Sequence, residues 1–212
     1  MIRVLVVDDH ELVADSLVRV LTLEADLVTV GVASKLSRAR EMVASTRPDV
    51  VLLDQEMPDG LGTDCIGALR AAHPQVQIVM LTASTSDQVL RRAMSAGAAG
   101  FVSKTSGLDE LVGAVRAAAR GDAVISPALL ARLLTRMRRE PSAVGRNITA
   151  REREILGLLA QGMSNAAIAA HLVLSVHTIR NHVASLLAKL GAHSKLEALA
   201  IAVRENLVEP PY

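Results

Sequence analysis

The feature that most constrains this chain is a series of short apolar runs in its first half. The runs are rich in Val, Ile and Leu and lie at residues 4–7, 28–32, 50–53, 76–81 and 100–102. Between them, apolar residues recur at helical spacing. Short runs that are apolar throughout indicate strands covered on both faces, and their alternation with helices is typical of a parallel sheet. We therefore predict an α/β fold with a doubly wound, five-stranded parallel sheet of flavodoxin-like order.

The second half of the chain predicts helices only. Its periodic segments cover residues 149–161, 164–172, 175–190 and 194–206. The first and the last of these begin with the spacing of a capping box, Thr149 with Glu152 and Ser194 with Glu197. Four short helices that follow a complete α/β sheet indicate a second, all-α domain.

The boundary between the two domains is marked by a helix end and by a change in composition. The helix after the fifth run is predicted to open with a capping box from Ser106 to Asp109 and to end near Gly121. We place the first domain at residues 1–121 and the all-α domain at residues 147–212. Residues 122–146 contain prolines and a basic stretch with helical leucine spacing, so they are predicted to form a linker that contains one helix.

Charge differs between the two halves. Residues 1–121 carry 12 basic and 15 acidic side chains, a net charge of −3, whereas residues 122–212 carry 11 and 7, a net charge of +4. This asymmetry predicts different partners for the two domains. An excess this small is weak evidence for nucleic acid by itself, so motifs must support that assignment.

The sequence shows neither a membrane-spanning segment nor a secretory signal. The longest apolar runs are far shorter than the roughly 20 residues that cross a bilayer. The N-terminal residues run directly into a predicted strand and lack the basic start and the small-residue cleavage site of a secretory signal. We therefore expect a cytoplasmic protein that does not interact with membranes.

Polar side chains gather where the predicted strands end. The first run is followed by Asp8 and Asp9, the third by Asp54 and the fourth by Thr82, while the fifth ends just before Lys104. In a doubly wound parallel sheet, ligands bind outside the carboxyl ends of the strands. Clustered carboxylates repel one another unless a cation neutralises them, and oxygen ligands of this kind suit Mg²⁺. The pattern predicts a magnesium site at this edge of the sheet.

This set of groups also predicts a reaction. A metal ion would shield Asp54 from the oxygens of an incoming phosphate, so that the carboxylate could attack phosphorus and form an acyl phosphate. Lys104 would pair with the phosphoryl group, and Thr82 would donate a hydrogen bond to it and draw its own loop inward. Phe101 could fill the vacated space, which would make a two-state switch. His10 is expected to be a loop residue and not a metal ligand.

The segments VLVVDDHE, LLDQEMPDGLG, MLTAS and AGAAGFVSK resemble the receiver domain of bacterial response regulators, over about residues 1–121. The resemblance implies that Asp54 is the phosphoacceptor. It assigns the metal to Asp8, Asp9, Asp54 and the backbone carbonyl of Glu56, and the switch to Thr82, Phe101 and Lys104. It further implies that a sensor histidine kinase supplies the phosphoryl group.

The segment from Ile148 to Ala202 resembles the LuxR-type DNA-binding domain of NarL/FixJ regulators. A helix-turn-helix places the start of its second helix in the major groove, and here that helix opens at Ser175. Among its outward residues, Arg180 and Asn181 can pair with guanine and adenine edges, and Ala184 lies beside them. The expected phosphate contacts are Thr178, Lys189 and Lys195. Relatives dimerise through the last helix, where Leu196, Leu199 and Val203 form an apolar stripe.

The resulting hypothesis is a response regulator that is not an enzyme, that is phosphorylated on Asp54 and that then binds double-stranded promoter DNA as a homodimer. A phosphatase with an aspartyl nucleophile is the rival from the enzyme class, but such enzymes typically need an aspartate where Glu56 stands. A receiver that serves only as a protein-interaction module remains the alternative. Lactone-binding regulators share the DNA-binding domain, but the five predicted βα units exclude their N-terminal fold.

Overall fold

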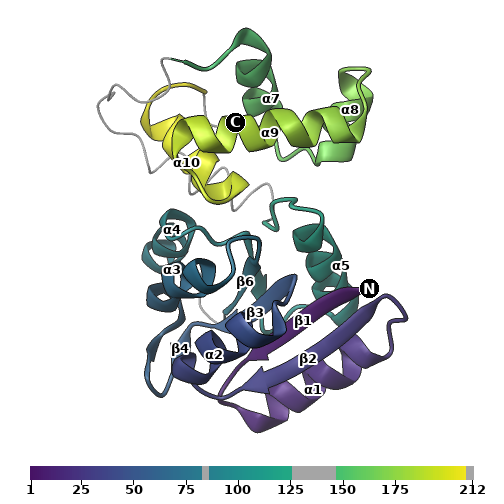
Figure 1. Cartoon of the computed structure of the whole chain (residues 1–212), viewed down its shortest axis with the longest axis vertical. Helices are drawn as coiled ribbons and strands as arrows, with labels where there is room; N and C mark the ends of the chain where they lie inside the picture. Colours follow the sequence, from purple (N-terminus) through teal and green to yellow (C-terminus); the bar gives the residue numbers. More distant parts are fainter. Residues whose placement is uncertain (83–85, 126–146, 209–212) are drawn as a thin grey trace. The chain divides into compact units, whose positions relative to one another are not determined.

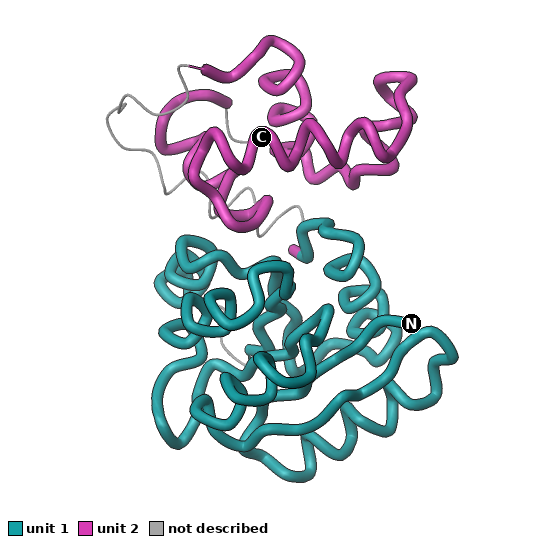
Figure 2. The backbone as a smooth tube through the Cα atoms, viewed as in Figure 1, with its two compact units in different colours: residues 1–124 teal, residues 125–212 magenta. Residues whose placement is uncertain are grey.

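The computed structural model describes residues 1–82, 86–125 and 147–208. The chain divides into two compact units, residues 1–124 and 125–212 (Figure 2). The predicted linker helix and its basic stretch fall within residues 126–146, outside the described residues. Each unit is described separately below.

The first unit is built on a parallel sheet. Its strands are β1 (Ile2–Val7), β2 (Leu27–Ala33), β3 (Val50–Asp54), β6 (Gln77–Thr82) and β7 (Gly100–Ser103), in the order β2-β1-β3-β6-β7 (Figure 1). Every neighbouring pair in this sheet is parallel. The predicted doubly wound, flavodoxin-like fold is therefore confirmed, and all five strands lie at the predicted runs.

Helices cover both faces of the sheet, which explains why the strands are apolar throughout. Helices α1 (Glu11–Thr22) and α5 (Leu108–Ala119) pack on the face that carries Val4, Val6 and Leu52. The other face is covered by α2 (Leu36–Thr46), α3 (Gly62–Ala72) and α4 (Asp87–Ser95). Residues 4–7 of β1 and all of β3 are buried, as expected for central strands of a parallel sheet between two helical layers, whereas the edge strand β2 is only partly buried.

A small hairpin between β3 and α3 was not predicted. Strands β4 (Glu56–Met57) and β5 (Gly60–Leu61) pair antiparallel immediately after Asp54. The hairpin returns the chain to the end of β3, where the Gly62 N–H donates to the carbonyl of Gln55 at 2.9 Å. A Cβ atom at Gly62 would overlap the backbone carbonyl oxygen of Asp54, so glycine is needed for this close approach.

The predicted capping box at the start of α5 is wrong. The helix begins at Leu108, and its N-cap residue is Gly107, which has no side chain to cap it. The Ser106 N–H donates instead to the carbonyl of Ser103 at 3.0 Å, in a turn that follows β7. The serine therefore lies in the turn, and Gly107 separates it from the helix.

The first unit continues just beyond Gly121, where α5 was expected to end the domain. Val124 forms a bridge with Gly100 at the sheet edge. Its carbonyl accepts from the N–H of Phe101 at 2.7 Å, and its own N–H donates to Ala99 at 3.0 Å. These bonds add residues 122–124 to the packed unit.

The second unit contains the four predicted helices. They are α7 (Ala150–Ala160), α8 (Asn165–His171), α9 (Val176–Leu190) and α10 (Lys195–Arg204). Helix α9 packs against the other three, and their facing apolar residues form the core. The capping box of Thr149 with Glu152 is confirmed. At Ser194 only half of the box forms, because the Glu197 carboxylate accepts from the N–H of His193 at 2.6 Å.

A buried ion pair joins α7 to α9. Glu152 is only 3% exposed, and its carboxylate accepts from Lys189 Nζ at 2.7 and 2.9 Å and from Ser185 Oγ at 2.8 Å. The same carboxylate closes the capping box with the N–H of Thr149. Burial by itself would raise the pKa of Glu152, but the hydrogen bonds from Lys189, Thr149 and Ser185 outweigh it and lower the pKa to about 2.

We predict that Glu152→Gln destabilises the second unit at pH 7 by about 1–3 kcal/mol, because it removes a charged acceptor from a buried network. The folded-state pKa lies below the usual value of 4.5, so this carboxylate stabilises the fold fully above about pH 4.5. The contribution is lost as the pH falls toward 2. Hydrogen exchange of α7 and α9 peptides from pH 7 to pH 3 measures both effects. Glu154→Gln is the matched control, because it removes only an exposed pair with Arg151. Equal pH profiles for the two variants would contradict the prediction.

We also predict that Gly62→Ala lowers the free energy of unfolding of the first unit by about 1–3 kcal/mol, because the added methyl group meets the Asp54 carbonyl. Gly67→Ala is the control in the same helix, and nothing lies within 4 Å of its added Cβ. It should stabilise the helix by about 0.5–1 kcal/mol. Urea denaturation followed by circular dichroism compares the two, and equal stabilities would refute the steric argument.

Candidate functional site

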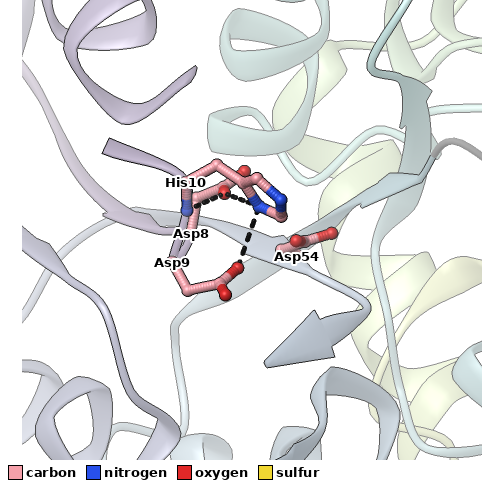
Figure 3. Close-up of side chains that lie close together, drawn as sticks. All are labelled: Asp8, Asp9, His10 and Asp54. Carbon is pink, nitrogen blue, oxygen red and sulfur yellow. Dashed lines mark hydrogen bonds and ion pairs between the residues drawn. The ribbon is translucent and has the colours of Figure 1, made fainter. Parts of the chain in front are cut away.

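The carboxyl ends of β1 and β3 bring the predicted aspartates together. Asp8, Asp9 and Asp54 cluster there with His10, and one potential ligand atom from each lies within 4.8 Å of all the others (Figure 3). Asp8 and Asp54 are 1% and 4% exposed, whereas Asp9 is exposed. The parallel topology explains this cluster, because neighbouring strands end at the same edge of the sheet.

Lys104 links the two buried carboxylates. Its Nζ lies 2.7 Å from Asp8 Oδ2 and 2.8 Å from Asp54 Oδ2. Burial lowers the pKa of the Lys104 ammonium, but the hydrogen bonds that it donates to Asp54 and Asp8 outweigh this effect and raise the pKa above its usual value. Lys104 follows β7, and its backbone N–H donates to the carbonyl of Thr82 at 3.0 Å, which fixes its position beside β6. The side chain is therefore a permanent cation at this edge.

The two oxygens of Asp54 have different surroundings. Its Oδ1 accepts from the N–H of Gln55 at 2.7 Å, which fixes the orientation of the carboxylate. Its Oδ2 faces Lys104. A cavity of about 270 Å³ opens beside this group and is lined by His10, Val13, Asp54, Gln55, Glu56, Thr82 and Lys104. The carboxylate that was predicted to be the nucleophile thus borders a space large enough for a small anionic group.

His10 lies closer to the aspartates than the sequence suggested. Its Nδ1 is 3.0 Å from Asp9 Oδ1 and 3.3 Å from Asp8 Oδ1, and its backbone N–H donates to Asp8 Oδ1 at 2.9 Å (Figure 3). The side chain is 64% exposed at the mouth of the cluster. The residue is in the loop before α1, as expected, and its imidazole contacts the two carboxylates.

The donor set of this cluster fits a hard divalent cation. Asp8, Asp9 and Asp54 supply carboxylate oxygens within a few ångströms of one another, and Glu56 follows Asp54 closely enough to line the same cavity. Oxygen ligands of this type are those that Mg²⁺ prefers. The acidic pocket therefore has the chemistry that a resident magnesium ion requires.

The predicted switch residues lie on adjacent strands. Thr82 ends β6 and is 6% exposed, and Phe101, on β7, is 8% exposed. Residues 83–85, the loop that Thr82 was expected to draw inward, lie outside the described residues. Thr82 lines the same cavity as Lys104, and Phe101 lies on the next strand, β7.

The start of α9 presents its predicted base-reading residues to solvent. Arg180, Asn181 and Ala184 are exposed on one side of the helix, and the Asn181 amide lies 3.3 Å from the Nε2 atom of His177. Ser175 caps the helix by accepting from the N–H of Thr178, whose hydroxyl lies 2.8 Å from the Ser175 hydroxyl. This side of the helix is accessible and rich in hydrogen-bonding groups.

Two of the expected phosphate contacts lie elsewhere. Lys189 donates to Glu152 inside the second unit, and its side chain is 31% exposed. Lys195 is buried in the folded chain, with 6% exposure. The structure therefore gives Lys189 a partner within the unit and shows Lys195 as buried, and the phosphate contacts of both lysines stay predictions. Sequence position cannot separate a lysine that pairs within the fold from one that faces a ligand.

The residues of the predicted dimerisation stripe lie on α10, and their role in dimerisation stays a prediction. Leu196, Leu199 and Val203 are 0%, 1% and 0% exposed. Helix α10 packs on α7 and α9, so these side chains belong to the buried interior of the chain.

Among the residues that the structure describes, no helix has the length and apolar character needed to cross a membrane.

Two known families match this chain. Residues 4–116 match the response regulator receiver domain, and residues 146–202 match the bacterial regulatory proteins of the luxR family. Together they cover both units. The matches include the acidic cluster, Lys104 and the whole of α9.

Full-length relatives have the same organisation. The chain is 36% identical to the probable transcriptional regulatory protein NarL of Mycobacterium tuberculosis, over 98% of this chain and 96% of that protein. It is 35% identical to the DNA-binding transcriptional activator DevR/DosR of the same species, over 100% and 98%. Among solved structures, the response regulator ChrA of a heme-sensing two-component system is 31% identical, with a TM-score of 0.52 and coverage of 97% and 98%. The chain therefore belongs to the response regulators of two-component systems that join a receiver domain to a LuxR-type DNA-binding domain.

Proposed function

We propose that Mg²⁺-dependent phosphorylation of Asp54 by a sensor histidine kinase controls sequence-specific binding of this regulator to promoter DNA. The observation that carries the proposal is the Lys104 ammonium, which lies between Asp8 and Asp54 and borders a cavity. This arrangement joins a carboxylate nucleophile, a fixed cation and a set of metal-binding oxygens. Each of these has a defined part in phosphoryl transfer.

The chemical step begins at the Asp54 carboxylate. Because the N–H of Gln55 holds Oδ1, Oδ2 is the oxygen that faces Lys104. It would form a bond to phosphorus while the bond from phosphorus to the kinase histidine nitrogen breaks. Lys104 would move from the two carboxylates to the phosphoryl oxygens, where its charge stabilises the product.

A magnesium ion held by Asp8, Asp9, Asp54 and the backbone carbonyl of Glu56 would supply charge neutralisation at the transferring phosphoryl group. The chain's own contribution is to hold these oxygens in place. Asp8 is buried and fixed by the N–H of His10, and its Oδ2 is held by Lys104. Residues that are already oriented lose little freedom when the ion and the phosphoryl group bind.

The signal would leave the site through Thr82 and Phe101. The Thr82 hydroxyl lies at the end of the strand next to Asp54, where it can donate to a phosphoryl oxygen. Phe101 is buried one strand further along, and movement of the loop after Thr82 would change the space around it. The loop and the Phe101 side chain would then have two packed arrangements, which can act as a switch.

DNA binding is assigned to the exposed start of α9. Arg180 and Asn181 would read base edges, Ala184 would leave room for close approach, and Thr178 would contact a phosphate. We propose that the active form is a homodimer on a two-fold-related site, because one helix reads only a few base pairs and a second copy doubles them.

We predict that the wild-type chain gains one phosphoryl group from acetyl phosphate in the presence of Mg²⁺, as measured by intact mass spectrometry. Asp54→Ala should gain none, and removal of Mg²⁺ by EDTA should abolish labelling. Asp64→Ala is the control, because it removes an exposed carboxylate of α3 that pairs with Arg92.

Genome-wide footprinting with and without the phosphodonor then tests whether phosphorylation controls DNA binding. Equal DNA binding by wild type and Asp54→Ala under both conditions would favour the receiver as a protein-interaction module.

We predict that Arg180→Ala relaxes base preference at one position of the DNA site, at a cost of about 1–3 kcal/mol in discrimination. Selection from a random DNA pool, followed by binding measurements on single-base variants, tests this. Arg153→Ala, on the exposed side of α7, is the control and should leave base preference unchanged. If Arg180→Ala selects the same site as wild type with the same discrimination, Arg180 is not a base reader.

A further inference from the structure

Helix α2 is capped by a residue from a distant part of the chain. Its own N-cap residue, Lys35, makes no capping hydrogen bond, and its first turn contains no acidic side chain. The free amides are bound instead by Asp59. Its Oδ1 accepts from the N–H of Leu36 at 2.8 Å, and its Oδ2 accepts from the N–H of Ser37 at 3.0 Å. One carboxylate thus replaces the local cap that this helix lacks.

Asp59 lies at the tip of the β4–β5 hairpin, between Met57 and Gly60. The tip also packs against the start of α2, because a Cβ atom at Gly60 would lie 3.5 Å from Leu36 Cδ1. The N–H groups of Ser37 and Leu36 lower the pKa of the Asp59 carboxyl, which keeps it ionised at neutral pH. The tip is therefore held to α2 by a charge-assisted, two-point contact.

The base of the same hairpin is attached to the phosphorylation site. Glu56 begins β4 two residues after Asp54, and Gly62 follows β5 and lies against the Asp54 carbonyl. The Gly62 N–H donates to the carbonyl of Gln55 at 2.9 Å. The hairpin thus has two fixed ends, one at Asp54 and one at the amino end of α2.

The other side of the tip borders a cleft of about 450 Å³, lined by Leu36, Ser37, Arg40, Asp59, Gly60, Leu61, Asp64, Cys65 and Ala68. On the side of α2, the two hydrogen bonds of Asp59 are polar restraints that hold the tip directly. Their loss would free the hairpin to move about its base, beside Asp54.

We infer that Asp59 is a positioning residue for the metal site. It fixes the β4–β5 hairpin against α2 and so sets the direction of the Glu56 carbonyl toward the acidic cluster. The inference rests on the proposed Mg²⁺-dependent phosphorylation, because Glu56 matters only if its carbonyl binds the ion. Asp59 itself does not line the cavity next to Asp54, so it acts through the backbone.

The test measures Mg²⁺ affinity of the full chain by isothermal titration calorimetry. We expect Asp59→Ala to raise the dissociation constant for Mg²⁺ about tenfold, the size of effect typical for residues that orient metal ligands. Asp59→Asn keeps one oxygen acceptor, so its dissociation constant should lie between those of wild type and Asp59→Ala. Phosphorylation by acetyl phosphate should slow at limiting Mg²⁺ and recover at saturating Mg²⁺. Asp64→Ala, which removes a carboxylate from the same cleft, should bind Mg²⁺ as wild type does.

A second variant separates positioning from helix stability. Lys35→Ser combined with Asp59→Ala gives α2 a local N-cap without restoring the bond to the hairpin. The double variant should regain thermal stability, while its Mg²⁺ affinity stays low. Wild-type affinity in Asp59→Ala, or full recovery of affinity in the double variant, would overturn the inference and leave the proposed function intact. Absence of Mg²⁺ binding by the wild-type chain would overturn both.

Discussion

The ion pairs of Lys104 with Asp8 and Asp54 are the interaction on which the site depends. Three carboxylates crowded at the ends of two strands would destabilise the fold through their mutual repulsion, and Lys104 offsets much of that cost. The lysine is brought there by β7, two strands away from β3. The sheet order that buries the core therefore also assembles the charges, and the site cannot form without the complete sheet.

A second lysine, in the other unit, has a different task. Lys189 and Glu152 connect α9 to α7, and the same carboxylate also caps α7. Because one carboxylate makes both contacts, α9 is linked to the first turn of α7. The exposed side of α9, with Arg180 and Asn181, is thereby held rigidly, which suits a helix that reads base edges.

Most predictions that depended on local pattern succeeded, although the capping box expected at Ser106 does not form. Residues 50–53 are apolar throughout because both faces of β3 are covered, and the capping box of Thr149 with Glu152 needs only residues three apart. The β4–β5 hairpin was missed because its strands are two residues long, too short for periodicity to show. The cap of α2 by Asp59 was missed for another reason, since 22 and 23 residues separate the bonded groups.

The sequence by itself determined the order of strands and helices, the residues at the strand ends and the family to which the chain belongs. These follow from spacing and residue type, which are local properties. Only the tertiary structure decided which charges and apolar groups remain available. Lys189, for example, was expected to contact phosphate, and the structure gives its ammonium a partner in Glu152. Availability depends on what packs against a side chain, and residues distant in the sequence supply that packing.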